Sequence, residues 1–181
     1  MLTKDYVKEV LITHEQIVAF CQELASTIEH EYKGKSFILL CILKGSVPFL
    51  AELSKHFTRD DINYEYIRAS SYEGESMNTS GEVKITNATF DSVKDQDIII
   101  LEDIIDTGHT LSILQKYLID SGAKSVKIAT LLDKPERREI DIVPDYVGFS
   151  IPNHFVIGFG LDYNEKYRNL KDIVIPYPEK L

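Results

Sequence analysis

Hydrophobic positions recur along the chain with helical and strand spacing in turn. Thr13 followed by Gln16 is typical of a capping box, and the apolar periodicity that follows predicts a helix over His14–Glu29. The apolar side chains on one face of this helix are Ile17, Cys21, Leu24 and Ile28. A shorter helix is predicted over Val47–His56. The first third of the chain therefore predicts two helices with an apolar segment between them.

Continuous apolar runs predict three strands that are buried on both faces. They are Phe37–Leu43, Asp97–Leu101 and Ser125–Leu132. Strands without polar residues on either face suit a sheet that helices cover on both sides. Ile62–Ile67 alternates apolar and polar residues and predicts a further strand.

The rest of the pattern completes an α/β order. Leu111–Ser121 predicts a helix that Gly122 ends. Short strand-like segments are predicted near Tyr146–Phe149, Val156–Phe159 and Ile173–Ile175. The β-α-β-α-β order predicts an α/β fold with a mainly parallel central sheet. Since no repeat or Pro/Gly linker interrupts the chain, one domain is expected over residues 1–181.

Composition narrows the class of protein. The chain has 181 residues and a formal net charge of −9, which disfavours general binding of nucleic acid because that binding rests on Lys and Arg. Acidic side chains suit Mg²⁺.

No apolar run reaches the roughly 18 residues that a membrane span needs, and Met1–Tyr6 does not begin a signal peptide, so a cytoplasmic protein is expected. Cys21 and Cys41 have no metal or redox spacing.

The segment Ile98–Thr110 gives the strongest functional signal. A buried strand runs into the adjacent carboxylates Glu102 and Asp103, and the turn Asp106–Thr110 leads into a helix. Ligands of open α/β sheets bind beyond the carboxyl ends of the strands. The turn offers backbone N–H groups at a helix N-terminus, and Gly108 permits a close backbone approach. The segment therefore predicts a phosphate site beside two carboxylates.

Other motif readings fit less well. Ile104–Gly108 also matches an aspartic protease half-site, whose chemistry needs two such carboxylates, and a second copy could come only from a symmetric dimer. A strand that ends in acids is typical of a Walker B motif, but Gly34–Ser36 supplies only the tail of a Walker A loop and precedes a strand. The chain also lacks the Gly-x-Ser-x-Gly motif that is typical of a hydrolase nucleophile.

Glu102–Thr110 resembles the phosphoribosyl diphosphate motif of the type I phosphoribosyltransferases, and the rest of the chain resembles their 6-oxopurine branch, the hypoxanthine-guanine phosphoribosyltransferases. The further matching segments, in order, are Leu43–Ser46, Ser71-Tyr72, Leu132–Lys134 and Phe155–Gly158 leading to Leu161–Arg168. The resemblance implies a mainly parallel central sheet flanked by helices, with a small hood built from the chain ends. It implies transfer of the 5-phosphoribosyl group from phosphoribosyl diphosphate to hypoxanthine or guanine, with release of pyrophosphate.

The resemblance also implies roles for individual residues. Asp106 matches the family's candidate general base at purine N7, and the backbone that follows it would hold the 5′-phosphate. Glu102 and Asp103 would contact the ribose hydroxyls directly or through Mg²⁺. The residues implied to bind phosphoribosyl diphosphate are Lys44, Gly45, Ser71, Tyr72, Glu102, Asp103, Asp106, Thr107, Gly108, His109, Thr110 and Arg168.

The purine site is implied by residues that spacing alone would not select. Lys134 would donate to the purine O6, Phe155 would stack on the ring, and Val156 would present backbone groups to the base edge. Leu161 and Asp162 complete the implied purine site. Without the resemblance, Lys134 would be read as a solvated lysine and Phe155 as a core aromatic.

Asp162 would also ligate Mg²⁺ bound to pyrophosphate, and Arg168 would donate to that leaving group. The implied metal ligands are therefore Glu102, Asp103 and Asp162. Lys44-Gly45 would hold pyrophosphate with its backbone, at a place where the family often has a non-proline cis peptide bond. The polar stretch Ser70–Gly81 resembles the family's mobile lid.

Some positions depart from the pattern or leave alternatives open. His109 and His154 stand where human-like members of the family have Lys. The family's interface arginine corresponds to Arg137 or Arg138, and the spacing favours Arg138; a homodimer or homotetramer is expected. A regulator built on the same fold, and an enzyme for adenine, orotate or a pyrimidine, fit the residues less well. The order of preference among hypoxanthine, guanine and xanthine stays open.

Overall fold

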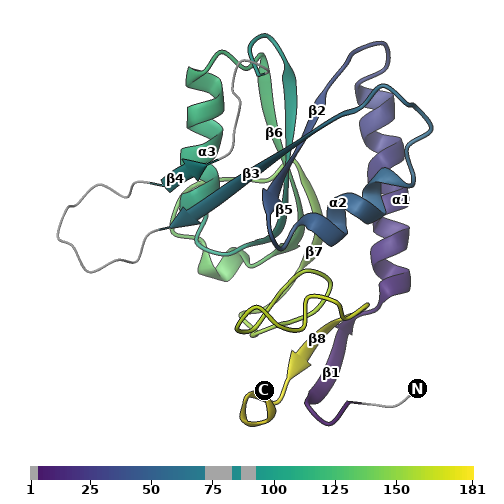
Figure 1. Cartoon of the computed structure of the whole chain (residues 1–181), viewed down its shortest axis with the longest axis vertical. Helices are drawn as coiled ribbons and strands as arrows, with labels where there is room; N and C mark the ends of the chain where they lie inside the picture. Colours follow the sequence, from purple (N-terminus) through teal and green to yellow (C-terminus); the bar gives the residue numbers. More distant parts are fainter. Residues whose placement is uncertain (1–3, 72–82, 87–92) are drawn as a thin grey trace, which may run out of the picture.

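A computed structural model describes residues 4–71, 83–86 and 93–181 of the chain. Its main sheet, within this described part, has the strand order β4-β3-β2-β5-β6-β7 (Figure 1). The strands are β2 (Ile38–Leu43), β3 (Asn63–Ser71), β4 (Val83–Thr86), β5 (Asp97–Ile105), β6 (Ser125–Asp133) and β7 (Tyr146–Ser150). All neighbours pair in parallel except β3 and β4. The predicted α/β fold with a mainly parallel sheet is confirmed, and β4 is an antiparallel edge strand that the sequence pattern did not predict.

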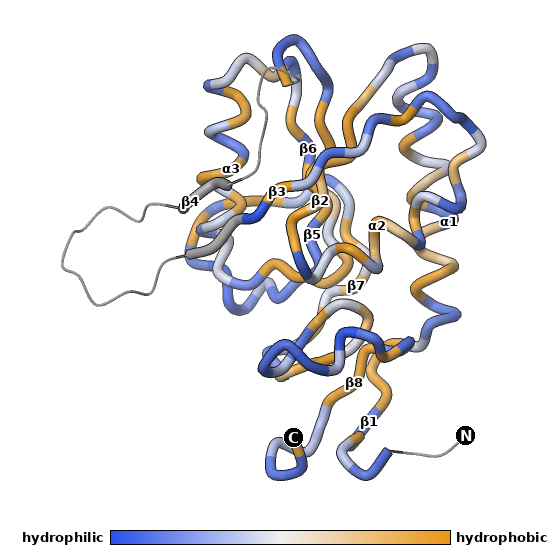
Figure 2. Tube along the Cα trace, viewed as in Figure 1, coloured by the Kyte–Doolittle hydropathy of each residue, from blue (hydrophilic) through white to orange (hydrophobic). Residues whose placement is uncertain are grey.

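Helices cover both faces of this sheet. The helices α1 (His14–Glu31) and α2 (Val47–Ser54) lie on one face, and α3 (His109–Asp120) lies on the other (Figure 1). Each face of the sheet has its own hydrophobic core. Successive residues of β2 point to opposite faces, so Leu39 and Cys41 pack on the α1 and α2 side while Leu40 packs on the α3 side. Hydrophobic segments therefore run through the centre of the molecule (Figure 2).

The two ends of the chain form a small second sheet. Strand β1 (Val7–Ile12) pairs antiparallel with β8 (Ile173–Pro176), below the main sheet in Figure 1. We call this sheet, with the loop Pro152–Asp172 that precedes β8, the hood. It confirms the predicted hood of chain ends. The strand predicted over Val156–Phe159 is wrong: Ile157 and Gly158 form isolated bridges only, since the positive φ of 46° at Phe159 ends the extended conformation.

Local signals set the helix ends. The Thr13 hydroxyl accepts from the N–H of Gln16 at 3.3 Å, and the Gln16 side chain accepts from the N–H of Thr13 at 2.9 Å, which confirms the capping box. Gly122 follows α3 with φ +92°, as a helix-ending glycine does. Helix α3 begins at His109, two residues earlier than predicted.

Strand β3 continues beyond its predicted end to Ser71, and residues 72–81 of the predicted lid lie outside the described residues. Short 3₁₀ turns occupy Pro135–Arg137 and Pro178–Lys180. No helix in the described ranges combines the length and the apolar character needed to cross a bilayer.

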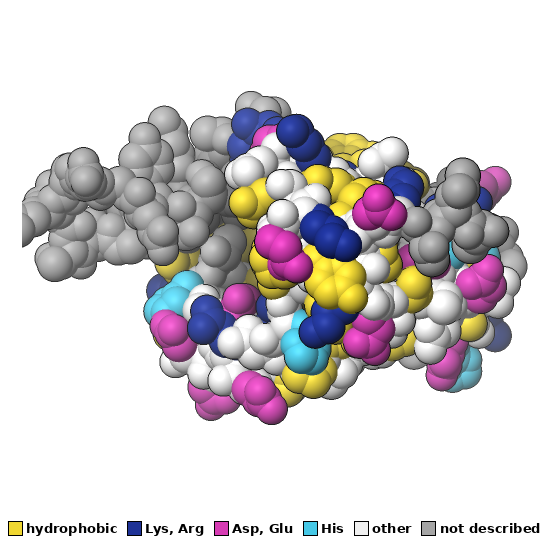
Figure 3. Space-filling model, turned by 90° about the horizontal axis from the view of Figure 1, so that it is seen from below, with side chains coloured by type: hydrophobic (Ala, Val, Ile, Leu, Met, Phe, Trp, Pro, Cys, Tyr) yellow, Lys and Arg dark blue, Asp and Glu magenta, His cyan; other side chains and the backbone are white. Residues whose placement is uncertain are grey.

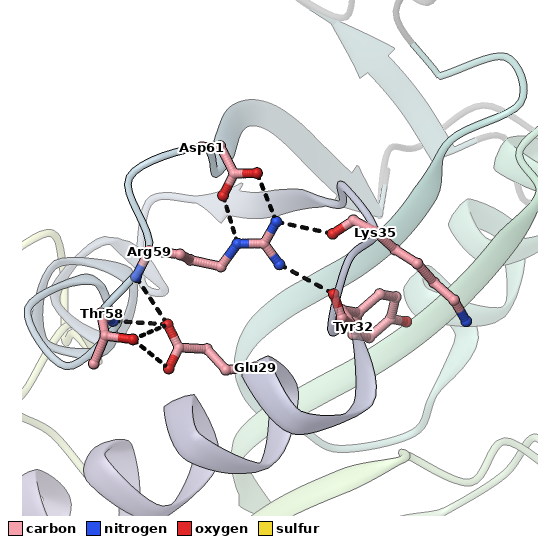
Figure 4. A network of polar contacts seen from close by, with 6 residues as sticks. All are labelled: Glu29, Tyr32, Lys35, Thr58, Arg59 and Asp61. Carbon is pink, nitrogen blue, oxygen red and sulfur yellow. Dashed lines mark hydrogen bonds and ion pairs between the residues drawn. The ribbon is translucent and has the colours of Figure 1, made fainter.

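A polar network joins the end of α1 to the segment between α2 and β3 (Figure 4). Arg59 donates to both oxygens of Asp61 and to the carbonyls of Tyr32 and Lys35, just after the last turn of α1. Glu29 accepts from the N–H groups of Thr58 and Arg59 and from the Thr58 hydroxyl. This network lies far from the carboxyl ends of the strands and anchors the entry to β3.

We expect Glu29→Gln to destabilise the protein at neutral pH by about 1 kcal/mol or less, since Glu29 is only partly buried and lies near the surface. Burial acts to raise the pKa of Glu29, but the hydrogen bonds from Arg59 and Thr58 outweigh it and lower the pKa. The carboxylate therefore adds stability above its unfolded pKa and loses it as the pH falls through the lower folded pKa. Urea unfolding of both proteins from pH 7 to pH 3 should show the difference shrinking with acid; a constant difference would contradict this origin.

Candidate active site

A cleft opens at the carboxyl ends of β2 and β5, where the hood meets the main sheet. Its volume is about 330 Å³. The cleft is lined by Ile42, Leu43, Lys44, Gly45, Glu102, Asp103, Ile104, Ile105, Asp106, Thr107, Gly108, Thr110, Leu111, Asp162 and Arg168. Parallel strands bring the turns after β2 and β5 together at this edge, so residues distant in sequence share one cavity.

The adjacent carboxylates at the end of β5 stand in the wall of the cleft. Glu102 Oε1 accepts from the Ser46 hydroxyl at 3.2 Å and from the N–H of Asp103 at 3.0 Å. Burial and the charge of Asp103 raise the pKa of Glu102 well above its usual range. Burial also raises the pKa of Asp103, although Arg168 and the N–H of Ile104 oppose this rise. The pair is thus a desolvated acidic site that a cation would stabilise.

The turn after β5 leads into α3 without a side-chain cap. Gly108 has φ +90° and takes the N-cap position, and no side chain of the described residues caps this helix. The backbone N–H groups at its first turn are therefore available to an anion, and the helix dipole favours negative charge there. Thr107 and Thr110 line the same part of the cleft. This geometry suits the binding of an anion such as a phosphate group.

Close backbone contact joins the hood to the turn after β2. A side chain on Gly45 would place its Cβ 1.5 Å from Asp103 Oδ2, so the carboxylate occupies the space that glycine leaves open. A Cβ on Gly160 of the hood would lie 1.9 Å from the Gly45 carbonyl oxygen. The peptide bond Leu43-Lys44 is cis, one bond before the predicted site at Lys44-Gly45.

The hood contributes the guanidinium of Arg168 and two carboxylates, those of Asp162 and Glu165, near the cleft. Arg168 pairs with Asp162 Oδ1 at 2.9 Å and with Glu165 Oε2 at 3.2 Å, and it donates to the Gly160 carbonyl at 2.8 Å. Its Nε is buried and has no hydrogen-bond partner among the described residues. Lys44 pairs with Glu165 at 2.9 Å across the cleft edge. One unused guanidinium donor therefore lies beside the acidic pair.

Lys134 is buried, with 8% of its surface exposed, directly after β6. Its backbone N–H donates to the Ile105 carbonyl at 3.0 Å, which fixes it beside the turn Asp106–Thr110, called the phosphate turn below for its predicted role. Burial lowers the pKa of the Lys134 ammonium, and the nearby Asp106 carboxylate acts in the opposite direction. A desolvated ammonium next to a carboxylate is a strong, oriented donor.

Comparison with known proteins agrees with this geometry. The sequence pattern of the phosphoribosyl transferase domain matches residues 8–164. The chain belongs to the phosphoribosyl transferase family. It is 50% identical over 173 residues to the hypoxanthine-guanine phosphoribosyltransferase of Lactococcus lactis, covering 96% of this chain and 93% of that protein.

Solved structures of phosphoribosyl transferases match over nearly the whole chain. The hypoxanthine phosphoribosyltransferase of Staphylococcus aureus superposes with a TM-score of 0.91 at 39% identity, covering 99% of this chain and 98% of that one. The Trypanosoma cruzi enzyme gives 0.91 at 36% identity, covering 99% and 96%. The fold of this phosphoribosyl transferase is therefore the type I fold that the sequence predicted.

The cleft gathers only part of the residue set predicted for this phosphoribosyl transferase. The residues implied to bind phosphoribosyl diphosphate line it, apart from His109, Ser71 and Tyr72. His109 is half-exposed on α3 and pairs with Glu139 at 3.0 Å. Ser71 ends β3, and Tyr72 lies outside the described residues.

The predicted purine residues stand beside the cleft and not in its lining, Asp162 excepted. Phe155 is 48% exposed and meets Tyr163 edge to face at 5.8 Å, so its ring is accessible. The side chains of Val156 and Leu161 are buried in the core.

Sequence reasoning gave no active-site role to three residues that this site uses. Ser46 donates to Glu102, Glu165 receives Lys44 and Arg168, and Arg137 donates to Asp106. Ser46 and Glu165 lie inside the motifs that carried the family resemblance, so their position was a usable signal. The partner of Arg137 lies 31 residues away in sequence and follows only from the fold.

The carboxylates fit a divalent cation that is shared with substrate. No group of three or more His, Cys, Asp or Glu side chains forms a complete metal cage within the described ranges. Glu102 and Asp103 nevertheless present a paired, desolvated oxygen site in the cleft. Mg²⁺ is usually held by one or two carboxylates together with substrate phosphates, which is the arrangement that this pair would allow.

Proposed function

We propose that this phosphoribosyl transferase moves the 5-phosphoribosyl group from phosphoribosyl diphosphate to hypoxanthine or guanine, giving the nucleotide and pyrophosphate in purine salvage. The observation that carries this proposal is one cleft that joins an uncapped helix N-terminus to the carboxylate pair Glu102 and Asp103, with a buried ammonium beside it. The relatives named hypoxanthine-guanine phosphoribosyltransferases support the choice of base.

The sugar phosphate is held by the chain's own groups in this proposal. The backbone N–H groups from Asp106 to Thr110 bind the 5′-phosphate, and Gly108 allows the close approach. Glu102 and Asp103 hold the ribose hydroxyls directly or through a cation. Mg²⁺, when bound, neutralises phosphate charge and assists the departure of pyrophosphate.

In this proposal, residues of the hood and of the turn after β2 hold pyrophosphate and its Mg²⁺. Asp162 would hold a cation bound to pyrophosphate, and Arg168, which lines the cleft, would donate to the leaving group. Lys44 and Gly45, which also line the cleft, supply backbone contacts to pyrophosphate. The transition state gains most from these groups, since negative charge builds on the leaving oxygen as the bond to the sugar breaks.

The base is oriented by Lys134 and loses a proton to Asp106. An ammonium donor favours a 6-oxo group and disfavours a 6-amino group, because the amino group is itself a donor. As the purine nitrogen bonds to the sugar, the N7 proton passes to the Asp106 carboxylate. Phe155 stacks on the base, and Val156, Leu161 and Asp162 border its edge.

Further parts of the proposal concern the whole molecule. We propose a single domain over residues 1–181, in which Ser71, at the end of β3, and Tyr72 contact the sugar diphosphate. His109 borders the phosphate. A homo-oligomer and a cytoplasmic location belong to the same proposal. Lys and Arg are interspersed with Asp and Glu on the face seen in Figure 3, which favours a small substrate over nucleic acid.

The testing experiment measures pyrophosphate release from phosphoribosyl diphosphate, with hypoxanthine, guanine, xanthine and adenine supplied separately. We expect turnover with hypoxanthine or guanine, none with adenine, and loss of turnover when Mg²⁺ is chelated and restored when it is returned. Binding of the sugar diphosphate without turnover on any base would instead indicate a regulator that uses the same fold. Turnover with adenine would refute the role of Lys134.

We expect Lys134→Ala to raise the KM for the base by about 10- to 100-fold, because a hydrogen bond to a charged group contributes about 1.5–3 kcal/mol. The KM for phosphoribosyl diphosphate should change little. Lys134→Met keeps a similar apolar stem in this buried place and separates loss of the ammonium from loss of packing. Steady-state kinetics on both substrates make the measurement; equal losses for both substrates in both variants would point to a structural role.

A further inference from the structure

A short segment after β6 contacts the phosphate turn at several points. We call residues Pro135–Ile140 the clamp segment. Its N–H groups at Glu139 and Ile140 both donate to the Thr107 carbonyl, at 3.0 and 3.2 Å. The Glu139 side chain pairs with His109 at the start of α3. The clamp segment therefore fixes the backbone of the turn that the proposed function assigns to phosphate.

Two arginines of the clamp segment reach Asp106 itself, in different ways. Arg138 Nη1 donates to the Asp106 backbone carbonyl at 2.7 Å, and Arg138 Nη2 pairs with Asp133 Oδ1. Arg137 Nε donates to Asp106 Oδ1 at 2.8 Å. Among the described residues, Arg138 thus holds the main chain of Asp106, whereas Arg137 holds its carboxylate.

The contact between Arg137 and Asp106 contributes little to stability. The two side chains are 46% and 43% exposed, so solvent screens most of the attraction between their charges. The contact does restrict rotation of a short side chain, and it engages one of the two carboxylate oxygens. The second oxygen, Oδ2, is left to accept a proton from another group.

We propose that Arg137 is a positioning residue for Asp106, which orients the carboxylate so that Oδ2 faces the purine N7 proton. The inference rests on the proposed function, in which Asp106 accepts that proton. As the base nitrogen bonds to the sugar carbon and the carbon–oxygen bond to pyrophosphate breaks, the N7 proton moves to Oδ2, while Oδ1 keeps its bond from Arg137. Arg137 contacts no substrate atom in this scheme.

Arg137 affects proton transfer to Asp106 in two opposite ways, through its charge and through the orientation of the carboxylate. Its positive charge opposes the arrival of a proton at Asp106, but both side chains are about half-exposed, so solvent screening keeps this effect below about tenfold in rate. Misplacement of a catalytic group by about 1 Å costs about 10²-fold. Orientation therefore outweighs this charge repulsion, and removing Arg137 should slow turnover.

Arg137→Gln and Arg137→Lys test this inference, with Lys116→Gln as the matched control. Lys116 pairs with Asp120 on the exposed face of α3 at 2.7 Å, away from the cleft. We expect Arg137→Gln to lower kcat by about 10- to 100-fold while the KM for phosphoribosyl diphosphate stays within about twofold. Arg137→Lys should restore part of kcat, and the control should match the wild type. Thermal unfolding should place all variants within a few degrees of the wild type.

A double-mutant cycle with Asp106→Asn makes the inference distinct from the proposed function. If Arg137 acts through the carboxylate, adding Arg137→Gln to Asp106→Asn should cause no further loss beyond about twofold. A full additional loss, an unchanged kcat, or a faster enzyme in the Arg137→Gln single variant would overturn the inference while Asp106 kept its role. Absence of 6-oxopurine turnover in the wild type would instead refute the proposed function.

Discussion

Asp106→Asn should lower kcat by about 10²–10⁴-fold, the range that a positioned general base contributes. An amide has nearly the shape of the carboxylate and still accepts a hydrogen bond from Arg137, but it cannot take the N7 proton. The backbone of the phosphate turn, held by Arg138 and by the N–H groups that bond to Thr107, should be unchanged.

Calorimetric binding of phosphoribosyl diphosphate, beside steady-state kinetics, makes the measurement. We expect the binding constant of the sugar diphosphate to stay within a few-fold of the wild type, since its phosphate is bound by the backbone. Unchanged turnover would remove Asp106 from the base role. Joint loss of binding and turnover would assign it to the phosphate site alone.

Gly45→Ala should abolish most activity while the protein still folds. The new methyl group would lie 1.5 Å from Asp103 Oδ2, so the Asp103 carboxylate must turn away from the cleft. The atom it meets belongs to a side chain, and Gly45 has no positive φ, so the backbone has no reason to move. We expect kcat/KM for phosphoribosyl diphosphate to fall by about 10²-fold or more.

Two other glycines separate this local effect from a general one. Gly34→Ala has open space around its Cβ and lies far from the cleft, so it should leave kcat/KM unchanged, with a stability cost of about 1–2 kcal/mol from its φ of +73°. Gly160→Ala meets backbone, the Gly45 carbonyl at 1.9 Å, and should lower both stability and activity. Kinetics and thermal unfolding on the three variants distinguish the cases. Gly45→Ala with normal activity would contradict the placement of Asp103.

The sequence predicted those helices, strands and turns that are determined by residues close together in the chain. The buried runs of β2 and β5 and the capping box of α1 are such elements, and the phosphate turn follows from one continuous motif. Strand β1 was not predicted, because Val7–Ile12 is mostly exposed and its partner lies at the other end of the chain. A short strand that depends on a distant partner has no strong periodicity of its own.

The candidate site shows the same limit. Motif residues such as Glu102 and Lys134 could be named from the sequence, since the family resemblance supplied their positions. The bond from Arg137 to Asp106 and the meeting of Gly45, Asp103 and Gly160 arise when the hood and the turns after β2, β5 and β6 come together. No spacing in the sequence encodes these distances, so only the fold shows them.

The pairing of the first strand with the last has a consequence for the growing chain on the ribosome. The residues of β2 to β7 are all synthesised before β8, so the main sheet can assemble while β1 still lacks its partner. The phosphate turn can thus form before the hood covers it. A chain that stops near residue 165 would carry an open cleft and an unpaired edge strand, the kind of surface on which nascent chains aggregate.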